Sequence, residues 1–160
     1  MTKVGNPVYV FDTSAWLTLI EDEAGADVVE NLLESAGSGG TEILVSFMSF
    51  MEVLYITLQE RDMEEAETRL NLMASLPIVR VESTASLSLT AGWLKAKHRI
   101  SVADAWIAAL AQKRGATLVH KDPEFDQIEK GLQVLRLPYK GKVNCQESQQ
   151  PGLYPPKDCS

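Results

Sequence analysis

The chain has 160 residues, of which 45% are hydrophobic and 23% are charged, and its formal net charge is −7. This length and composition suit one globular domain and exclude a wholly disordered chain. The acidic balance argues against a protein that holds nucleic acid by bulk positive charge, although it is compatible with chemistry at a divalent metal, whose ligands are themselves acidic.

Strands and helices are predicted to alternate along the chain. Short apolar runs rich in β-formers predict strands, and longer segments with an apolar face predict helices. In chain order, the expected elements are a strand at Val8–Phe11, helices at Ser14–Ile20 and Ala24–Ser35, a strand at Ile43–Val45, helices at Phe47–Glu60 and Asp62–Ser75, a strand at Ile78–Val81, helices at Thr84–Lys97 and Ser101–Arg114, a strand at Thr117–His120, a short helix at Pro123–Glu129 and a strand at Gln133–Leu137.

Some residues predict how these helices end and how they are buried. Gly115 is expected to stop the helix before it, because glycine favours the left-handed conformation that ends many helices. Segment Phe47–Glu60 is apolar nearly all round, so we expect it to be well buried. In the helix Asp62–Ser75, Met63 and Met73 are expected to face the core.

The alternation predicts an α/β fold, with a central, mostly parallel sheet and helices on both faces, over residues 1–140. Residues 141–160 hold three prolines and little apolar periodicity, which predicts an irregular tail outside the core. Both cysteines, Cys145 and Cys159, lie in that tail, so no disulfide framework is expected in the core and a reduced, cytoplasmic setting is favoured. Neither a signal peptide nor a membrane span is expected.

Acidic side chains occur where strands are predicted to end or where apolar helices begin. Asp12 and Asp122 follow predicted strands, while Glu52 and Asp104 lie within apolar segments. Ligands of parallel α/β sheets bind outside the carboxyl ends of the strands, so these acids can converge at one edge. We take them as the candidate catalytic and metal-binding residues.

Each acid also has a structural explanation. Ser49-x-x-Glu52 and Ser101-x-x-Asp104 fit capping boxes, and Asp12 and Asp122 fit helix N-caps. Together, however, buried and mutually repelling carboxylates are costly, and a bound divalent cation removes both penalties. A set of oxygen ligands favours Mg²⁺ or Mn²⁺ over Zn²⁺.

The same segments resemble the motifs of the PIN-domain family. They are Asp12-Thr-Ser-Ala, the buried Glu52, Ala103-Asp104-Ala-x-Ile-Ala-Ala and Leu118-Val-His-Lys-Asp122-Pro-Glu-Phe125, with the acids 40, 52 and 18 residues apart. The resemblance covers roughly Val8 to Leu137 and is strongest to the VapC-type ribonuclease toxins. It implies a PIN-like three-layer fold, metal-dependent RNA cleavage, a homodimer and, for toxins, a cognate antitoxin.

The last motif departs from the common VapC pattern. Many relatives carry a second Asp just before the Phe, where this chain has Glu124. The fourth acid is therefore Asp122 or Glu124, and we favour Asp122 because it follows the strand closely. Thr13, Ser14 and Lys121 are candidate substrate-binding residues; for Thr13 and Ser14 a helix-capping role is equally open.

Other residues could contribute to binding or assembly. Basic side chains gather in the segment that includes Lys95, Lys97, Arg99, Lys113 and Arg114 and could steer phosphates, although single lysines are more often simply solvated. The tryptophans, which could stack on bases, are more often core residues. The helices at 47–60 and 62–75 could form a dimer interface or be buried in the monomer.

Two alternatives to a ribonuclease stay open. A PIN-like domain can serve as a catalytically weak RNA- or protein-binding module, and a related α/β fold can carry a metal-dependent DNA nuclease or phosphatase. An ATPase is disfavoured because no glycine-rich phosphate loop of the Walker type is present. The preference for RNA over DNA rests on the family resemblance alone.

Overall fold

A five-stranded parallel sheet forms the centre of the molecule in the computed structural model, which describes residues 4–139. The strands are β1 (Val8–Phe11), β2 (Glu42–Ser46), β3 (Val79–Val81), β4 (Thr117–His120) and β5 (Gln133–Arg136). They lie in the order β3-β2-β1-β4-β5, and all four pairings are parallel. The predicted α/β fold with a mostly parallel sheet is confirmed.

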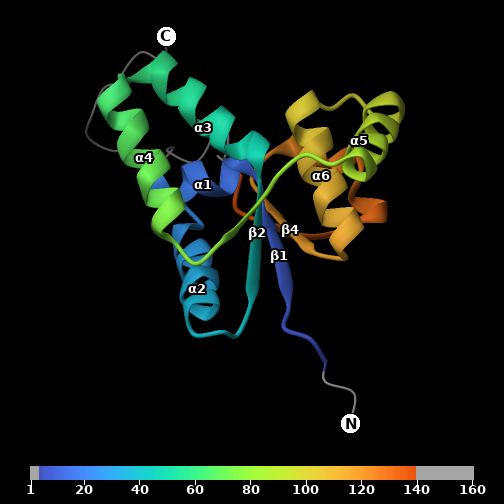
Figure 1. The fold of residues 1–160 in the computed structure, drawn as a ribbon, viewed down its shortest axis with the longest axis horizontal. Coiled ribbons are helices and arrows are strands. Elements are labelled where there is room, and N and C mark those ends of the chain that lie inside the picture. Colours follow the sequence, from blue (N-terminus) through green and yellow to red (C-terminus); the bar gives the residue numbers. More distant parts are fainter. Residues whose placement is uncertain (1–3, 140–160) are drawn as a thin grey trace, which may run out of the picture.

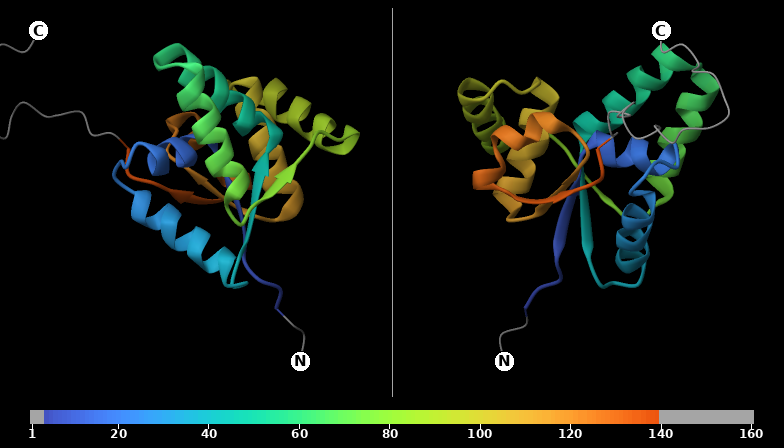
Figure 2. Two further views of the ribbon diagram at one scale, coloured as in Figure 1. Left: turned by 60° about the vertical axis from the view of Figure 1, so that its left-hand side comes forward. Right: turned by 180° about the vertical axis from the view of Figure 1, so that it is seen from behind.

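Helices cover both faces of this sheet (Figures 1 and 2). They are α1 (Thr13–Ile20), α2 (Ala26–Gly37), α3 (Phe47–Glu60), α4 (Met63–Ser75), α5 (Ala85–Lys97) and α6 (Val102–Arg114). Helices α1 to α4 lie on one side, and α5 and α6 lie on the other. Two apolar clusters correspond to these layers: Phe11, Trp16 and Val45 belong to the first, and Val10, Leu44 and Ile107 to the second. Alternate side chains along β1 and β2 therefore pack into opposite layers.

The predicted short helix after β4 consists of two 3₁₀ turns, Pro123–Gln127 and Glu129–Gly131. Asp122 caps the first turn, since its side chain accepts a hydrogen bond from the backbone N–H of Glu124. The turns are too short for a regular α-helix to offset its nucleation cost. Gly115 ends α6 in the left-handed conformation, with φ of 57°, as expected.

Helices α3 and α4 are less buried than predicted. Met51, Tyr55 and Leu58 of α3 are 41–48% exposed, and Met63 of α4 is 52% exposed, whereas Met73 is fully buried. Helix α3 packs mainly against α4, α1 and α6, which leaves the remaining apolar side chains in contact with solvent. The expectation of a well-buried α3 is therefore wrong for this chain taken alone.

The tryptophans have three different environments. Trp16 is fully buried in the α1 layer, Trp106 is half-buried with its ring edge-on to Phe47, and Trp93 is 64% exposed beneath the ammonium group of Lys97. Within residues 4–139, no helix is long and apolar enough to cross a bilayer. The predicted irregular tail, with Cys145 and Cys159, lies outside the described residues, so its character stays a prediction.

Candidate metal centre at the carboxyl edge of the sheet

The two central neighbouring strands bring Asp12 and Asp122 to the same edge of the sheet. Strand β1 pairs with β4 so that Phe11 lies opposite Val119, and the backbone N–H of Asp12 donates to the carbonyl of Val119 at 3.0 Å. Both acids therefore follow the carboxyl ends of adjacent parallel strands, which is where ligands bind in such sheets.

Asp12 is a buried carboxylate with one side left unsatisfied. Its Oδ2 accepts hydrogen bonds from the backbone N–H and the hydroxyl of Ser14, so it does cap α1. Its Oδ1 is buried without a hydrogen-bond partner. The pKa of Asp12 is raised from 3.8 to about 7, mainly by burial; the hydrogen bonds from Ser14 oppose this rise, and the nearby charges of Glu52 and Asp122 contribute to it. A cap needs only one carboxylate oxygen, so capping leaves Oδ1 unexplained.

Asp104 projects from the first turn of α6 on the opposite layer. It is only 6% exposed. Its pKa is raised to about 8, mainly by burial, with smaller contributions from the Asp12 charge and the Glu124 carboxyl group. The N-cap of α6 is Ser101, which accepts from the N–H of Asp104, but the N–H of Ser101 donates to Glu124 rather than to Asp104. The reciprocal half of the expected capping box is thus absent, and the Asp104 carboxyl group is not used as a cap.

Glu52 also departs from the capping explanation. The N-cap of α3 is Ser46, so Glu52 lies beyond the first turn, and Ser49 is buried inside the helix. Thr13 donates its hydroxyl to Glu52 Oε1 at 2.7 Å. Burial raises the pKa of Glu52, the bond from Thr13 opposes this, and Asp122 again contributes repulsion. The carboxylates from β1, α3, α6 and the β4 end therefore influence one another electrostatically.

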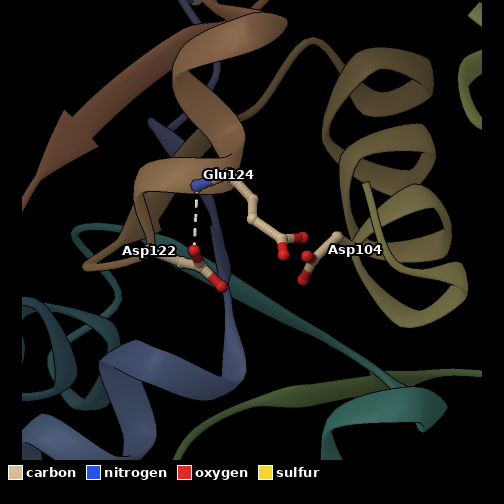
Figure 3. Close-up of side chains that lie close together, drawn as sticks. All are labelled: Asp104, Asp122 and Glu124. Carbon is tan, nitrogen blue, oxygen red and sulfur yellow. Dashed lines mark hydrogen bonds between the residues drawn. The ribbon is translucent and has the colours of Figure 1, made fainter. Parts of the chain in front are cut away.

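Glu124 joins these acids, as Figure 3 shows. The carboxyl groups of Asp104, Asp122 and Glu124 point toward a common space, and each offers an oxygen within 4.8 Å of the others. The sequence left open whether Asp122 or Glu124 is the fourth acid of the site. In the structure both carboxyl groups lie beside Asp104, so neither replaces the other. The sequence signal for Glu124 was its position before Phe125, where relatives carry Asp, but that signal alone could not place its side chain.

This donor set fits a hard divalent cation. Its atoms are carboxylate oxygens only, which suits Mg²⁺ or Mn²⁺. The unpartnered Oδ1 of Asp12 and the raised pKa values of Asp12, Glu52 and Asp104 are the penalties that a cation would remove. Clustered acids without a counter-charge would otherwise destabilise the folded chain.

A match to a protein-family model shows which family the chain belongs to. The family model for the PIN domain matches residues 9–131. The chain belongs to the PIN-domain family. The matched range contains Asp12, Glu52, Asp104, Asp122 and Glu124, so the whole acidic cluster lies within the PIN domain.

Individual relatives of this PIN domain are known. The chain is 29% identical over 124 residues to ribonuclease VapC11 of Mycobacterium tuberculosis and to VapC ribonuclease Mb1587 of Mycobacterium bovis, covering 74% of this chain and 90% of each relative. Its fold is similar to that of VapBC2 from Rickettsia felis bound to a promoter DNA fragment, with a TM-score of 0.68 and 22% identity over 82% of this chain and 99% of that chain. It is also similar to VapC20 of Mycobacterium tuberculosis, a sarcin-ricin loop cleaving toxin, with a TM-score of 0.63 and 20% identity over 81% and 98% of the two chains.

The three expected substrate-binding residues of this PIN domain already have protein partners. Thr13 is 5% exposed and bound to Glu52. Ser14 donates to Asp12 and accepts from the backbone N–H of Lys121 at 2.8 Å. The ammonium group of Lys121 pairs with Glu23 at 2.7 Å, and the Lys121 side chain is 8% exposed. The geometry therefore favours positioning of the acids by Thr13 and Ser14, and it does not present Lys121 as a free phosphate ligand.

The basic side chains that were expected to steer phosphates do not all lie near the acids. Lys113 and Arg114 end α6, whereas Asp104 lies in its first turn, so they are about 15 Å away along the helix axis at 1.5 Å per residue. Lys97 lies over the ring of Trp93 at 4.3 Å from its centroid, on the outer surface of α5. Lys113 and Arg114 therefore do not border the acidic edge.

Thr13→Val is expected to weaken Mn²⁺ binding by about 10- to 100-fold, the usual effect of removing a group that orients a metal ligand. Valine has nearly the same shape but cannot donate to Glu52, which frees that carboxylate to rotate. Isothermal titration with Mn²⁺ would measure the affinity. Thr13→Ser, which keeps the hydroxyl, should bind Mn²⁺ nearly as the unmodified chain does; equal affinities for all three chains would exclude a role for the Thr13–Glu52 bond.

Proposed function

We propose that this chain is an endoribonuclease that depends on Mg²⁺ or Mn²⁺ and hydrolyses RNA phosphodiester bonds. The observation that carries the proposal is the buried Asp12 carboxylate, whose Oδ1 has no protein partner and lies among other acids at the carboxyl edge of the sheet. The names of the related ribonucleases VapC11 and Mb1587 support RNA as the substrate.

Asp12 and Asp104 would hold the cation, and Glu52, Asp122 and Glu124 would complete its surroundings directly or through water. When bound, the cation supplies a more acidic water and neutralises charge that develops on the scissile phosphate. Thr13 holds Glu52 and Ser14 holds Asp12, so the carboxylates are oriented before the cation arrives. Burial of Asp12 and Asp104 excludes bulk water and strengthens their interaction with the cation.

The proposal extends to the biological setting and the partners. The solved structures of similar fold include a toxin–antitoxin complex from Klebsiella pneumoniae, which supports a role as the toxin of a type II module, acting in the cytoplasm with a cognate antitoxin. A homodimer would cover the exposed side chains of Met51, Tyr55 and Leu58 on α3. The molar mass of the purified chain at micromolar concentration tests the dimer, because a single monomeric species would exclude it.

The central test is cleavage of a structured RNA pool by the purified chain with Mn²⁺, with Mg²⁺ and with excess chelator. We expect cleavage only with metal, and no cleavage of DNA of the same sequences. Cleavage of the DNA alone would favour a DNA nuclease. Metal binding without cleavage of any nucleic acid would favour the alternative of a non-enzymatic binding module.

A further inference from the structure

Helix α5 packs against α6 at the margin of the domain (Figure 1), and its outer surface carries a tryptophan that the core does not use. Trp93 is 64% exposed, and Leu89, one turn earlier, is 73% exposed. The ammonium group of Lys97, one turn later, lies over the Trp93 ring. Residues four apart share one face of a helix, so these three side chains are neighbours. We call Leu89, Trp93 and Lys97 the α5 patch; apolar side chains gathered in this way at a surface mark interaction sites.

Two hollows border the α5 patch, which lines both of them. The first has a volume of about 310 Å³ and is closed by Thr90 and Leu94 and by Gln112 of α6, and the second has about 410 Å³ and is closed by Ser88, Gly92 and Ala96. These two sets of α5 residues lie on opposite flanks of Trp93, because successive residues of a helix are about 100° apart. The indole ring therefore stands between two open spaces, where a planar ligand can lie against it.

The segment around the α5 patch is basic in an otherwise acidic chain. No Asp or Glu occurs at residues 83–103, although the chain has 22 in total, and this segment contains Lys95, Lys97 and Arg99. All three side chains are exposed, and none is paired with an acid within residues 4–139. Cations that lack an internal partner are available to an anionic ligand such as a phosphate backbone.

The loop that follows α5 connects this surface to the acidic edge. The backbone N–H of Arg99 donates to the side chain of Gln127, which donates in turn to the Arg99 carbonyl, both at 3.1 Å. The N–H of Ser101 donates to the carboxylate of Glu124. Trp93 lies four residues before the end of α5, about 6 Å along the helix axis. A strand bound at the α5 patch can therefore continue to the acids.

We propose that the α5 patch is a binding subsite for a single-stranded part of the RNA substrate; this rests on the proposed ribonuclease function. Trp93 stacks on an unpaired base, and Lys97 and Arg99 contact the adjoining phosphates. Tryptophan rings and nearby cations are the usual means of holding a single strand without regard to sequence. A second copy of the chain would fit less well, because a symmetric interface through this patch would place the same cations opposite one another.

Binding of a labelled single-stranded RNA, about eight nucleotides long, tests the subsite without cleavage when it is measured in excess chelator. Trp93→Leu is expected to weaken binding roughly 5- to 100-fold, since leucine keeps apolar surface but cannot stack on a base. Trp93→Phe keeps an aromatic ring and should recover most of the affinity. Fluorescence anisotropy gives the three dissociation constants. Equal affinity of the leucine variant and the unmodified chain would overturn the proposal.

Tryptophan fluorescence reports whether the base stacks on the ring itself. Trp16 is fully buried and Trp106 half-buried, so Trp93 is the most exposed of the three tryptophans. RNA should quench the fluorescence of the unmodified chain, and most of this quenching should be absent in Trp93→Phe. Quenching of the same size in both chains would place the bound base elsewhere and contradict the proposal.

The salt dependence of binding tests the phosphate contacts. Lys97→Gln should reduce the slope of log affinity against log salt concentration by about 0.7, the value for one phosphate contact with a single strand. Arg61→Gln removes the same charge at the end of α3, on the other side of the sheet, and should leave the slope unchanged. An unchanged slope for Lys97→Gln, or equal reductions in both variants, would reject the phosphate contact.

Molar mass and cleavage kinetics separate the subsite from the other proposals. If Trp93→Leu changes the molar mass of the purified chain but not its RNA affinity, the α5 patch is an interface between copies and the subsite is rejected. Metal-dependent cleavage with a raised KM and an unchanged kcat in Trp93→Leu supports both the subsite and the nuclease. Cleavage with an unchanged KM rejects the subsite and keeps the nuclease. RNA binding that depends on Trp93, without any cleavage, keeps the subsite and rejects the nuclease.

Discussion

Asp104→Asn is expected to reduce metal-dependent RNA cleavage by a factor on the order of 100 or more, with the fold unchanged. Asparagine keeps the shape of the side chain but removes the charge that would bind the cation, and metal catalysis supplies several kcal/mol of transition-state stabilisation. The hydrogen bond from the Asp104 backbone N–H to Ser101 does not involve the replaced group, so α6 keeps its N-cap.

The comparison needs a matched variant and a check of folding. Asp62→Asn also replaces an aspartate with its amide, but at the exposed N-cap of α4, where the amide oxygen can still accept from Glu65. It should retain full activity. Circular dichroism of all three chains confirms the fold. Equal cleavage by Asp104→Asn and the unmodified chain would show that Asp104 does not hold a catalytic metal.

The metal-free chain is expected to lose stability as the pH rises from about 4 to about 8. The pKa of Asp12 is raised from 3.8 to about 7, and that of Asp104 to about 8, mainly through burial. Between the unfolded and folded pKa values the native state holds protons that the unfolded state has released, so the free energy of unfolding falls with pH. The stabilising contribution is complete below pH 3.8 and is lost once the pH passes about 8.

Asp12→Asn should remove most of the pH-dependent part of the unfolding free energy that comes from Asp12. For a pKa shift of this size, that part amounts to about 4 kcal/mol. The buried amide lacks a partner for one polar group, which costs about 1–3 kcal/mol at every pH. Urea unfolding in the presence of chelator gives the free energy of unfolding at pH 5 and at pH 8. The difference between the two values therefore reports the effect of the Asp12 charge and not the constant cost of the buried amide. Saturating Mn²⁺ should stabilise the unmodified chain at pH 8 and affect the variant little; parallel pH profiles in chelator would show that Asp12 has an ordinary pKa.

The strand and helix order could be predicted because local pattern and tertiary position agree in this chain. Strands β1 and β4 are short apolar runs, and both bounds match the prediction. The left-handed Gly115 likewise ends α6 where the sequence indicates. The solvent-facing side of α3 could not be predicted, because an all-round apolar helix does not reveal which of its faces lacks a partner.

The candidate site was predictable as a set of acids but not as a geometry. Convergence of Asp12 and Asp122 follows from the parallel pairing of β1 and β4, which alternation of elements implies. The contribution of Glu124 depends on the 3₁₀ turn that directs its side chain toward Asp104, and the ion pair of Lys121 joins it to a glutamate 98 positions away. Sequence spacing carries no information about such distant pairings.

The central position of β1, between β2 and β4, has a consequence during synthesis on the ribosome. Asp12 is made before the other acids of the cluster, but β1 pairs with β4 only after residue 120 has emerged, and the turn that carries Asp122 and Glu124 comes later still. A nascent chain therefore lacks a complete acidic cluster until almost the whole domain has been translated. An enzyme that cleaves RNA would thus be inert beside the very messenger and ribosome that produce it, without needing any inhibitor at that stage.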